Sequence, residues 1–157
     1  SIYYAQNIAT IADDLRDVRP QIFTTVPRLL EKVYDRIVAK GYELTGLKRR
    51  IFLWALDLGL KYDPNKQFGW LYTKQLELAN KLVFSKWREA LGDNLRMICS
   101  GAAALQPRLA RVFWAAQIPV SEGYGMTEAS PVIATNRVAP LDLRIGTVGP
   151  IVDGGEV

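Results

Sequence analysis

The sequence contains no histidine and only one cysteine, Cys99, among its 157 residues. Without histidine, the chain cannot supply a histidine general base, a serine–histidine–aspartate triad or a histidine-ligated metal. With a single cysteine it can form neither an internal disulfide nor a cysteine-rich zinc site, which fits a reducing compartment. Any metal that this chain holds must therefore be a hard cation with oxygen ligands, such as Mg²⁺.

Long apolar runs and strong charge are lacking too. No segment reaches the ~18 apolar residues of a membrane span, and no signal peptide opens the chain. Lysine and arginine number 20 against 16 aspartates and glutamates, so the net charge is +4. This mild excess favours an anionic ligand or a lipid surface, whereas nucleic-acid binders usually concentrate more positive charge. We expect a cytoplasmic protein without a nucleic-acid partner.

The remaining composition is that of a folded domain. Apolar residues make up 49% of the chain and charged residues 23%, which is enough for a buried core. No repeat, low-complexity tract or linker divides the chain, so residues 1–157 are expected to form one unit. The chain begins at Ser1 without a methionine and stops at Val157 within an expected strand, which favours a piece of a longer protein.

The patterning of apolar residues predicts alternating strands and helices. Strands are expected at 1–5, 21–26 (a buried strand), 95–99 and 118–121, with strand and turn at 145–157. Helices are expected from an Asn7 N-cap to residue 18, and then over 27–41, 45–60, 70–91 and 107–116. This order predicts a layered α/β fold with mostly parallel strands and flanking helices, in which Cys99 is a small core residue.

The middle of one expected helix, residues 51–60, is apolar on nearly every side (IFLWALDLGL). Such a helix is buried on several sides, or forms the wall of an acyl tunnel, or touches a membrane. Lys48, Arg49 and Arg50 precede it, and a basic cluster of this kind is either a solvated face or a contact for an anionic lipid surface. The sequence leaves these alternatives open, and with them a peripheral contact with a membrane.

One stretch concentrates groups that can bind a nucleotide: residues 121–128, SEGYGMTE. Its glycines permit a tight turn and a close approach of the backbone to a ligand. Tyr124 offers a flat face for a base, Thr127 a donor for a phosphate oxygen, and Glu128 a hard oxygen for Mg²⁺. The stretch follows an expected strand, and ligands of open α/β sheets lie beyond the carboxyl ends of the strands.

Two other glycine-containing stretches have a similar placement. Residues 100–105, SGAAAL, follow the strand expected at 95–99 and precede a helix, so their backbone groups could meet the edge of a base. Residues 146–150, GTVGP, form a turn near the end of the chain. Taken alone, each stretch is also compatible with an ordinary structural turn.

Together these stretches resemble the motifs of the acyl-adenylate-forming enzymes, a superfamily of acyl-CoA synthetases, adenylation domains and luciferases. GYGMTE (123–128) resembles their adenine- and magnesium-binding motif, SGAAAL (100–105) their SGGAPL turn, and residues 146–157 their GTVGxPxPGxEV segment, all in the family's order. Three further stretches are similar to the long-chain fatty acid–CoA ligase branch: residues 26–33, 48–56 and 81–92. The resemblance covers essentially the whole chain.

The resemblance implies a role for each matching residue. Tyr124 stacks on adenine, Thr127 binds the α-phosphate and Glu128 holds Mg²⁺, which makes the last two the catalytic pair. Met126 touches the acyl end of the pocket. The remaining residues expected around the nucleotide are Gly101, Ala102, Ala103, Glu122, Gly123 and Gly125.

The sequence departs from the family's pattern at three positions within these motifs. Ala102 and Ala104 replace a glycine and a proline, and their methyl groups could crowd the base. Glu122 stands where many relatives have glutamine, and its carboxylate can accept a bond from the adenine amino group but brings charge.

The resemblance also implies what the whole protein does. It would convert a fatty acid, ATP and coenzyme A into acyl-CoA through acyl-AMP, with Mg²⁺. The phosphate loop, hinge and small C-terminal domain would lie outside this chain, which would be an interior slice of the large N-terminal domain and inactive alone. An enzyme that adenylates another carboxylate and a non-catalytic lipid-surface or interaction module remain alternatives. Oligomeric state and chain-length preference are not indicated.

Overall fold

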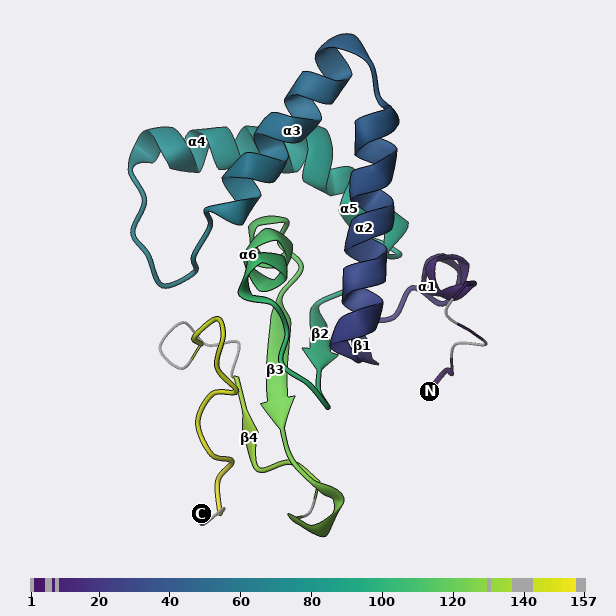
Figure 1. The fold of residues 1–157 in the computed structure, drawn as a ribbon, viewed down its shortest axis with the longest axis vertical. Coiled ribbons are helices and arrows are strands. Elements are labelled where there is room, and N and C mark those ends of the chain that lie inside the picture. The colour runs from purple at the N-terminus through teal and green to yellow at the C-terminus, as the bar shows by residue number, and fades with distance from the viewer. Residues whose placement is uncertain (1, 5–6, 8, 130, 137–142, 155–157) are drawn as a thin grey trace.

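The computed structural model describes residues 2–4, 7, 9–129, 131–136 and 143–154. Helices gather at one end of the molecule, and β3 runs from them toward the other end (Figure 1). The elements, in chain order, are α1 (Ile11–Val18), β1 (Ile22–Thr25), α2 (Pro27–Glu43), α3 (Gly46–Leu60), α4 (Trp70–Ala79), the π-helical η1 (Asn80–Phe84), α5 (Ser85–Ala90), β2 (Met97–Ser100), α6 (Pro107–Ala115), β3 (Val120–Tyr124), the 3₁₀ turn η2 (Thr127–Ala129) and β4 (Ala134–Thr135).

The sheet confirms the predicted α/β class with mostly parallel strands. Its strand order is β1-β2-β3-β4, and β1 pairs with β2, and β2 with β3, in parallel. Strand β4 pairs antiparallel with β3 through Gly123–Thr135 and Tyr124–Ala134. The two parallel connections each pass through helices, as parallel pairing requires.

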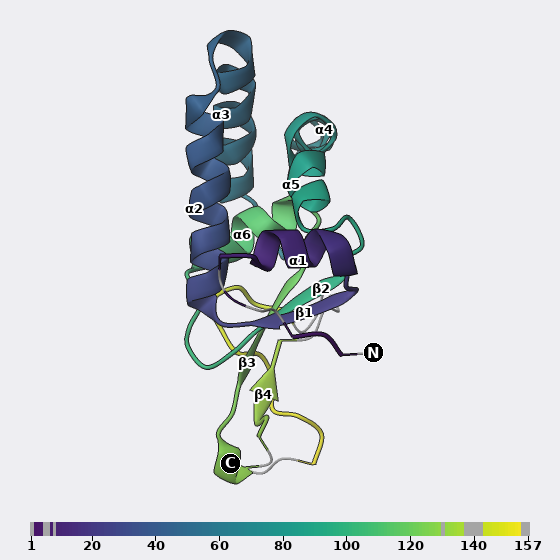
Figure 2. The ribbon, with the colours of Figure 1, turned by 90° about the vertical axis from the view of Figure 1, so that its right-hand side faces the viewer.

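Helices α2 and α3 form an antiparallel hairpin that stands beside the arm made by α4 and α5 (Figure 2). Proline at the first position of α2 fixes a helical φ and loses no hydrogen bond there. Near the hairpin's end, a Cβ atom on Gly41 would lie 2.1 Å from Cε1 of Phe52. Glycine at position 41 therefore allows the aromatic ring of α3 to lie directly against α2.

The core lies where α3, α5 and α6 meet. Phe84 and Phe113 are fully buried and Trp87 is nearly so, and the ring of Trp87 makes edge contacts with both phenylalanines and with Tyr34 of α2. Gly59 of α3 approaches this cluster closely, since an added Cβ would lie 3.1 Å from Cζ of Phe84. The 51–60 stretch of α3 is accordingly packed on several sides, which confirms the buried-helix alternative.

A buried polar network joins the long helix expected over 70–91 to the end of α6. The amide of Asn80 donates to the carbonyl of Ala115 at 2.9 Å. Nη1 of Arg88 donates to Oδ1 of Asn80 at 2.9 Å and to the carbonyl of Ala116 at 2.8 Å. These bonds satisfy carbonyls that the end of α6 leaves free, and the helix widens into η1 at Asn80.

Several local expectations differ from the structure. Residues 2–4 form no strand, and residues 1 and 5 lie outside the described part. Helix α1 begins at Ile11 with Thr10 as its N-cap, because Asn7 Oδ1 instead accepts the N–H groups of Ala9 and Thr10 in a turn before the helix.

Two further expectations concern the edges of the sheet. The sequence predicts a buried strand at 21–26, whereas Ile22 of β1 is 59% exposed, since β1 is the outer strand of the described sheet. Residues 145–154 contain one isolated bridge, from Ile151 to Ala134, in place of a strand, and 155–157 lie outside the description. Cys99 lies in β2 as expected but is only partly buried, and that burial raises the pKa of its thiol.

No helix in the described ranges is long and apolar enough to cross a membrane.

Candidate functional site

The carboxyl ends of three parallel strands meet at one edge of the sheet. Thr25 of β1 lies opposite Ser100 of β2, and Ser100 lies opposite Glu122 of β3. The N–H of Gly101 donates to the carbonyl of Thr25 at 3.2 Å, which holds the start of the next segment at this edge. The structure thus brings the 100–105 and 121–128 stretches together, as the sequence predicts.

The 100–105 turn is open on its outer side and tightly held on its inner side. Ala102, Ala103 and Ala104 are exposed, whereas Leu105 is buried. Ala102 has a φ of +69°, in the left-handed region that disfavours residues with a Cβ. Oγ of Ser100 is buried and has no hydrogen-bond partner within the described part of the chain. The turn therefore carries local strain at the edge where a ligand would lie.

The side chain of Glu122 points into the protein and not toward the open edge. Glu122 is 7% exposed, and its Oε1 accepts a hydrogen bond from the N–H of Leu105 at 3.1 Å. Burial raises the pKa of this carboxyl, while hydrogen bonds from the backbone of Leu105 and Gly146 oppose the rise. The carboxylate therefore fastens the 100–105 turn and the Gly146 turn to β3.

Tyr124 ends β3 with its side chain 49% exposed. Its carbonyl accepts the N–H of Ile133 at 2.8 Å, so the backbone is fixed while the ring remains accessible. This arrangement suits a stacking surface and does not suit a core aromatic residue.

The glycines around Tyr124 serve different purposes. An added Cβ on Gly125 would lie 1.7 Å from the carbonyl oxygen of Pro131, so the fold itself requires glycine there. At Gly101 and Gly123 the nearest atoms to an added Cβ lie at 3.8 and 3.7 Å, which is ordinary contact. The fold does not require glycine at these two positions, and their backbones remain open to a close-lying ligand.

The residues after Gly125 present polar groups to solvent. Met126 is 46% exposed, and Thr127 and Glu128, in the turn η2, are also exposed. The side chains of Thr127 and Glu128 make no hydrogen bond or ion pair with residues that the structure describes. The hydroxyl of Thr127 and the carboxylate of Glu128 are therefore both available to a ligand.

These donors fit a metal ion that a nucleotide brings with it. Among the described residues no group of three or more histidine, cysteine, aspartate or glutamate side chains gathers to hold a metal. Mg²⁺ usually takes only one or two carboxylates from a protein and completes its shell with phosphates and waters. One exposed carboxylate, Glu128, beside one hydroxyl matches that mode.

Asn136, which none of the sequence motifs includes, holds the third glycine stretch in place. Asn136 is 3% exposed, and its amide donates to the carbonyls of Arg144, at 3.1 Å, and of Thr147. Its N–H donates to the carbonyl of Glu122 at 2.8 Å. The stretch around Gly146 is thereby fixed to β3, and only the local sequence Ala-Thr-Asn before an irregular region could have hinted at it.

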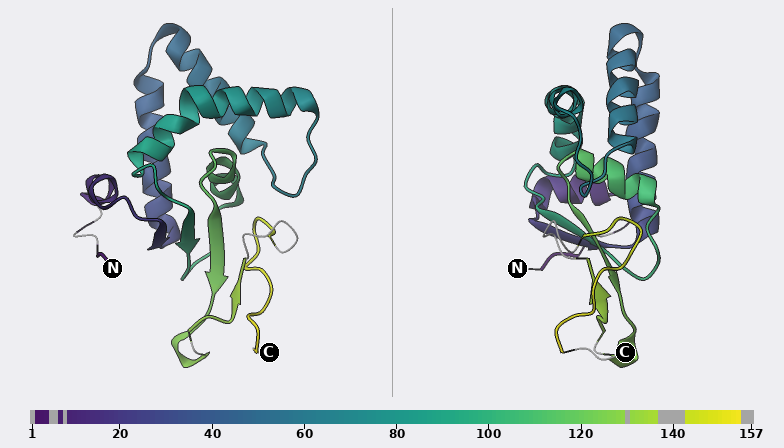
Figure 3. Two further views of the ribbon diagram at one scale, coloured as in Figure 1. Left: turned by 180° about the vertical axis from the view of Figure 1, so that it is seen from behind. Right: turned by 90° about the vertical axis from the view of Figure 1, so that its left-hand side faces the viewer.

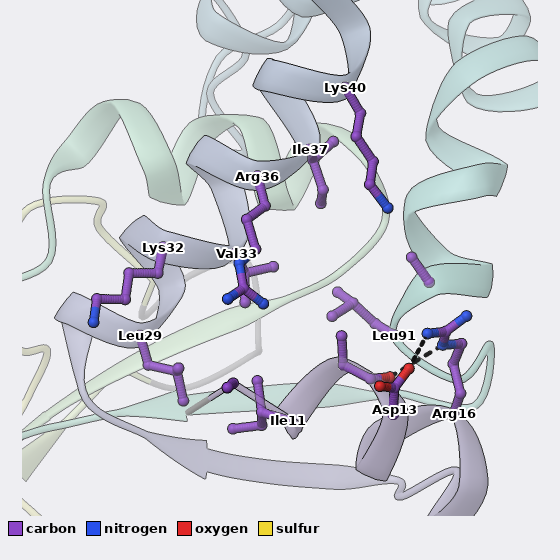
Figure 4. Close-up of a pocket in the computed structure, with 13 residues that line it drawn as sticks. Ile11, Asp13, Arg16, Leu29, Lys32, Val33, Arg36, Ile37, Lys40 and Leu91 are labelled. Atoms are coloured by element: carbon purple, nitrogen blue, oxygen red, sulfur yellow. Dashed lines mark hydrogen bonds and ion pairs between the residues drawn. The ribbon is translucent and has the colours of Figure 1, made fainter. Parts of the chain in front are cut away.

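A hollow of about 240 Å³ opens elsewhere, between α1, α2 and the end of α5 (Figure 4). At its edge Arg16 of α1 is paired with Asp13. None of the residues of the three glycine stretches lines it, so it does not belong to the candidate site. Its lining combines apolar and basic side chains of α2, namely Leu29, Lys32, Val33, Arg36, Ile37 and Lys40.

The fold and this edge together define an α/β protein whose ligand site lies beyond the carboxyl ends of parallel strands. The model of the AMP-binding enzyme family matches residues 2–157, and the chain belongs to this family.

Two of the curated proteins to which this chain is similar are long-chain-fatty-acid–CoA ligases. The chain is 35% identical over 133 residues to the long-chain-fatty-acid–CoA ligase ACSBG2 of Homo sapiens, covering 82% of this chain and 20% of that protein. It is 31% identical over 160 residues to the long-chain-fatty-acid–CoA ligase FadD15 of Mycobacterium bovis, covering 100% of this chain and 26% of that protein. The chain thus spans between a fifth and about a quarter of the length of these relatives.

A solved structure shows the same fold. The anthranilate CoA ligase AuaEII, crystallised with anthranoyl-AMP, matches 97% of this chain and 20% of its own chain with a TM-score of 0.51 at 19% identity. This likeness supports the predicted assignment of the chain to the fold of the adenylate-forming enzymes.

Proposed function

We propose that the protein containing this chain activates a long-chain fatty acid with ATP and transfers the acyl group to coenzyme A. A carboxylate oxygen of the fatty acid attacks the α-phosphorus of ATP, and the bond to pyrophosphate breaks to leave acyl-AMP. The sulfur of coenzyme A then attacks the acyl carbonyl, its thiol proton is lost, and AMP leaves. The observation that carries the proposal is the exposed row Tyr124, Thr127 and Glu128 at the carboxyl edge of the sheet.

Each residue of the row has a distinct part in this proposal. The ring of Tyr124 stacks on adenine, and the open backbones of Gly101 and Gly123 lie against the edges of the base. The hydroxyl of Thr127 donates to an α-phosphate oxygen. Ala102, Ala103, Gly125 and Met126 complete the nucleotide surface.

Glu122 keeps a place in the binding set in an indirect role. Its carboxylate is engaged by the N–H of Leu105, so it supports the turn that borders the base instead of contacting the adenine amino group. Glu122 is thus a positioning residue for the 100–105 turn.

Glu128 is the residue that would hold Mg²⁺ through its carboxylate. A bound Mg²⁺ neutralises charge on the phosphates as pyrophosphate departs. With no histidine in the chain, catalysis by these residues rests on positioning and on charge stabilisation.

We also propose that the protein lies in the cytoplasm and is longer than this chain. A single cysteine fits a reducing cytoplasm, and the chain would be one part of a large N-terminal domain. Support for the longer protein comes from the share of the relatives' length that the chain covers.

Replacement of Glu128 by glutamine in the full-length protein tests this function. Glu128→Gln keeps the shape of the side chain and removes its charge, so adenylation should fall by about 10²-fold or more. The measurement is palmitate-dependent exchange of pyrophosphate into ATP at saturating Mg²⁺. Glu89→Gln, which changes an exposed carboxylate on α5, is the matched control and should keep wild-type activity.

The same assay distinguishes the alternatives. Activity of the wild type with benzoate-like acids but not with palmitate would identify another carboxylate-adenylating enzyme. Absence of exchange with every carboxylate, together with absence of ATP binding, would favour an interaction module. Near-normal activity of Glu128→Gln would remove Glu128 from the metal site.

A further inference from the structure

The connection between α2 and α3 projects from the molecule at the end opposite to β4 and the C-terminal segment (Figures 1 and 3). We call residues 42–50, which include the end of α2, the connection and the start of α3, the hairpin tip. All nine of its residues are exposed. The candidate site follows the carboxyl ends of the strands, so the tip lies far from it along the molecule.

The hairpin tip combines exposed apolar side chains with positive charge. Tyr42 is 50% exposed, Leu44 38% and Leu47 70%. Lys48, Arg49 and Arg50 follow directly, and Lys40 precedes the tip, against one carboxylate at position 43. Lys48 and Arg50 form no ion pair with a described residue. Most of the positive charge of the tip is therefore left uncompensated.

The tip is an ordered piece of structure. The N–H of Leu44 donates to the carbonyl of Gly41 at 3.2 Å, and Phe52 lies against Gly41 just below. The guanidinium of Arg49 lies 5.7 Å from the centre of the Tyr42 ring, within the range of a cation–π contact. The apolar and basic side chains are therefore presented together on a fixed support.

We propose that the hairpin tip docks on the surface of a bilayer that contains anionic phospholipid. Leucine and tyrosine side chains enter the interface between headgroups and acyl chains, and the cations contact phosphate and carboxylate headgroups. The docking uses no residue of the candidate site, so it stands or falls independently of the proposed reaction. It would hold the enzyme where long-chain fatty acids dissolve.

The shape of the tip favours a bilayer over a protein partner. A partner helix or peptide is usually received in a groove, whereas the tip is convex. No residue of the tip lines the hollow between α1 and α2 or the open hollow along α4, η1 and α5. A planar, negatively charged, deformable surface is the complement of a convex basic tip with exposed leucines.

The test measures binding of the full-length protein to vesicles of phosphatidylcholine with and without phosphatidylserine. We expect co-sedimentation with the phosphatidylserine vesicles that weakens as salt is raised. Leu44→Ser/Leu47→Ser and Arg49→Glu/Arg50→Glu should each weaken vesicle binding by about tenfold or more.

Two matched controls locate the effect. Lys81→Glu/Lys86→Glu makes the same change of charge on η1 and α5, and Trp70→Ser/Leu71→Ser removes exposed apolar surface from the start of α4, where these side chains are 74% and 63% exposed. Both controls should bind vesicles much as the wild type does. The urea midpoint of each variant identifies any that is misfolded.

The readout also separates docking from catalysis. Tip variants should adenylate octanoate, a soluble substrate, at the wild-type rate, because the tip is remote from the candidate site. Absence of wild-type binding to phosphatidylserine vesicles overturns the proposal. Wild-type binding by both tip variants, or equal losses in the controls, overturns it as well.

Discussion

The carboxylate of Glu122 on β3 accepts a hydrogen bond from the backbone N–H of Leu105, 17 residues earlier in the chain. The bond fastens the turn after β2 to the strand that ends in Tyr124, so two of the three glycine stretches are joined by one side chain. Its cost is the burial of a carboxylate, which raises the pKa of Glu122 above its usual value of 4.5. The position of the turn and the charge of Glu122 are thus coupled.

This coupling predicts a dependence of stability on pH. Because the pKa of Glu122 is raised in the folded state, its contribution to stability is fully present below pH 4.5 and is lost as pH rises through the folded-state pKa. Glu122→Gln cannot ionise and keeps one oxygen for the N–H of Leu105, but its amide NH2 cannot accept the bond from Gly146. The stability of the full-length variant relative to the wild type should therefore increase as the pH rises from acid to neutral, whatever the constant cost of the lost bond.

Urea unfolding at a series of pH values from acid to neutral measures this difference. Glu89→Gln, on the exposed surface of α5, is the control and should give parallel curves. A Glu122→Gln variant whose stability relative to the wild type falls as the pH rises would show that the charge of Glu122 strengthens the fold.

The backbone of Ala102 predicts a stabilising substitution. Its φ of +69° is costly for a residue with a Cβ, by about 1–2 kcal/mol, whereas glycine adopts it freely. Part of this gain is offset by the greater freedom of glycine in the unfolded chain. We expect Ala102→Gly to raise the free energy of unfolding by about 0.5–1 kcal/mol, measured by urea denaturation.

The neighbouring alanine supplies the control for that substitution. Ala103 is exposed like Ala102, but its φ is not positive. Ala103→Gly should therefore lower stability by about 0.5–1 kcal/mol. Equal effects of the two substitutions would mean that the left-handed backbone at position 102 stores no strain.

The two glycines that flank Tyr124 should respond oppositely to alanine. In Gly125→Ala the new methyl would lie 1.7 Å from the carbonyl oxygen of Pro131, so we expect a loss of stability of about 3 kcal/mol or more. In Gly123→Ala the nearest atom lies at 3.7 Å, and stability should change by no more than about 0.5 kcal/mol. ATP affinity of Gly123→Ala should nevertheless fall by about tenfold if the base lies against this backbone.

Urea midpoints and ATP titrations of both variants in the full-length protein provide the comparison. A Gly123→Ala variant with wild-type ATP affinity would place the base elsewhere. A stable Gly125→Ala variant would show that the loop through Pro131 can move away.

The sequence predicts the helices well where local signals act alone. Proline opens both α2 and α6 at the expected residue, and each helix ends within two residues of the expected position. Gly92 has a φ of +93°, which explains why it stops the long helix before β2. These features depend on the residue itself and its neighbours, so a sequence pattern can reveal them.

Features that depend on contacts between residues far apart in the sequence cannot be predicted from a local sequence pattern. The π-helical stretch at Asn80 accompanies bonds to Ala115 and Arg88, and no local pattern announces either partner. Strand β4 has only two residues and is held through Asn136. The inward direction of Glu122 likewise depends on Leu105, which a motif match does not include.

For the candidate site, the sequence predicts where the residues lie in the fold but not how each one is held. A strand leading into glycine, tyrosine, threonine and glutamate gives the edge of the sheet and the exposed row. It does not distinguish Gly125, which the packing requires, from Gly101 and Gly123, which it does not. That distinction depends on what lies opposite each glycine, which only the folded chain shows.

The exposure of Tyr124 leads to the sharpest test of a nucleotide site. Truncation of a fully buried aromatic side chain to alanine lowers the free energy of unfolding by about 3–5 kcal/mol. A stacking platform instead contributes about 1–3 kcal/mol per stacked base, by analogy with nucleic-acid binding. Because Tyr124 is 49% exposed, we expect Tyr124→Ala to weaken ATP binding about 5- to 150-fold with little change in the urea midpoint.

Two conservative variants and one control complete that experiment in the full-length protein. Tyr124→Phe and Tyr124→Trp keep a π-face and should restore most of the ATP affinity. Tyr42→Ala removes a tyrosine of nearly equal exposure, 50%, from the hairpin tip and should leave ATP affinity unchanged. A collapsed midpoint for Tyr124→Ala, with unchanged ATP affinity in the folded fraction, would make Tyr124 a packing residue, because a ring that only fills space contributes to stability and not to binding.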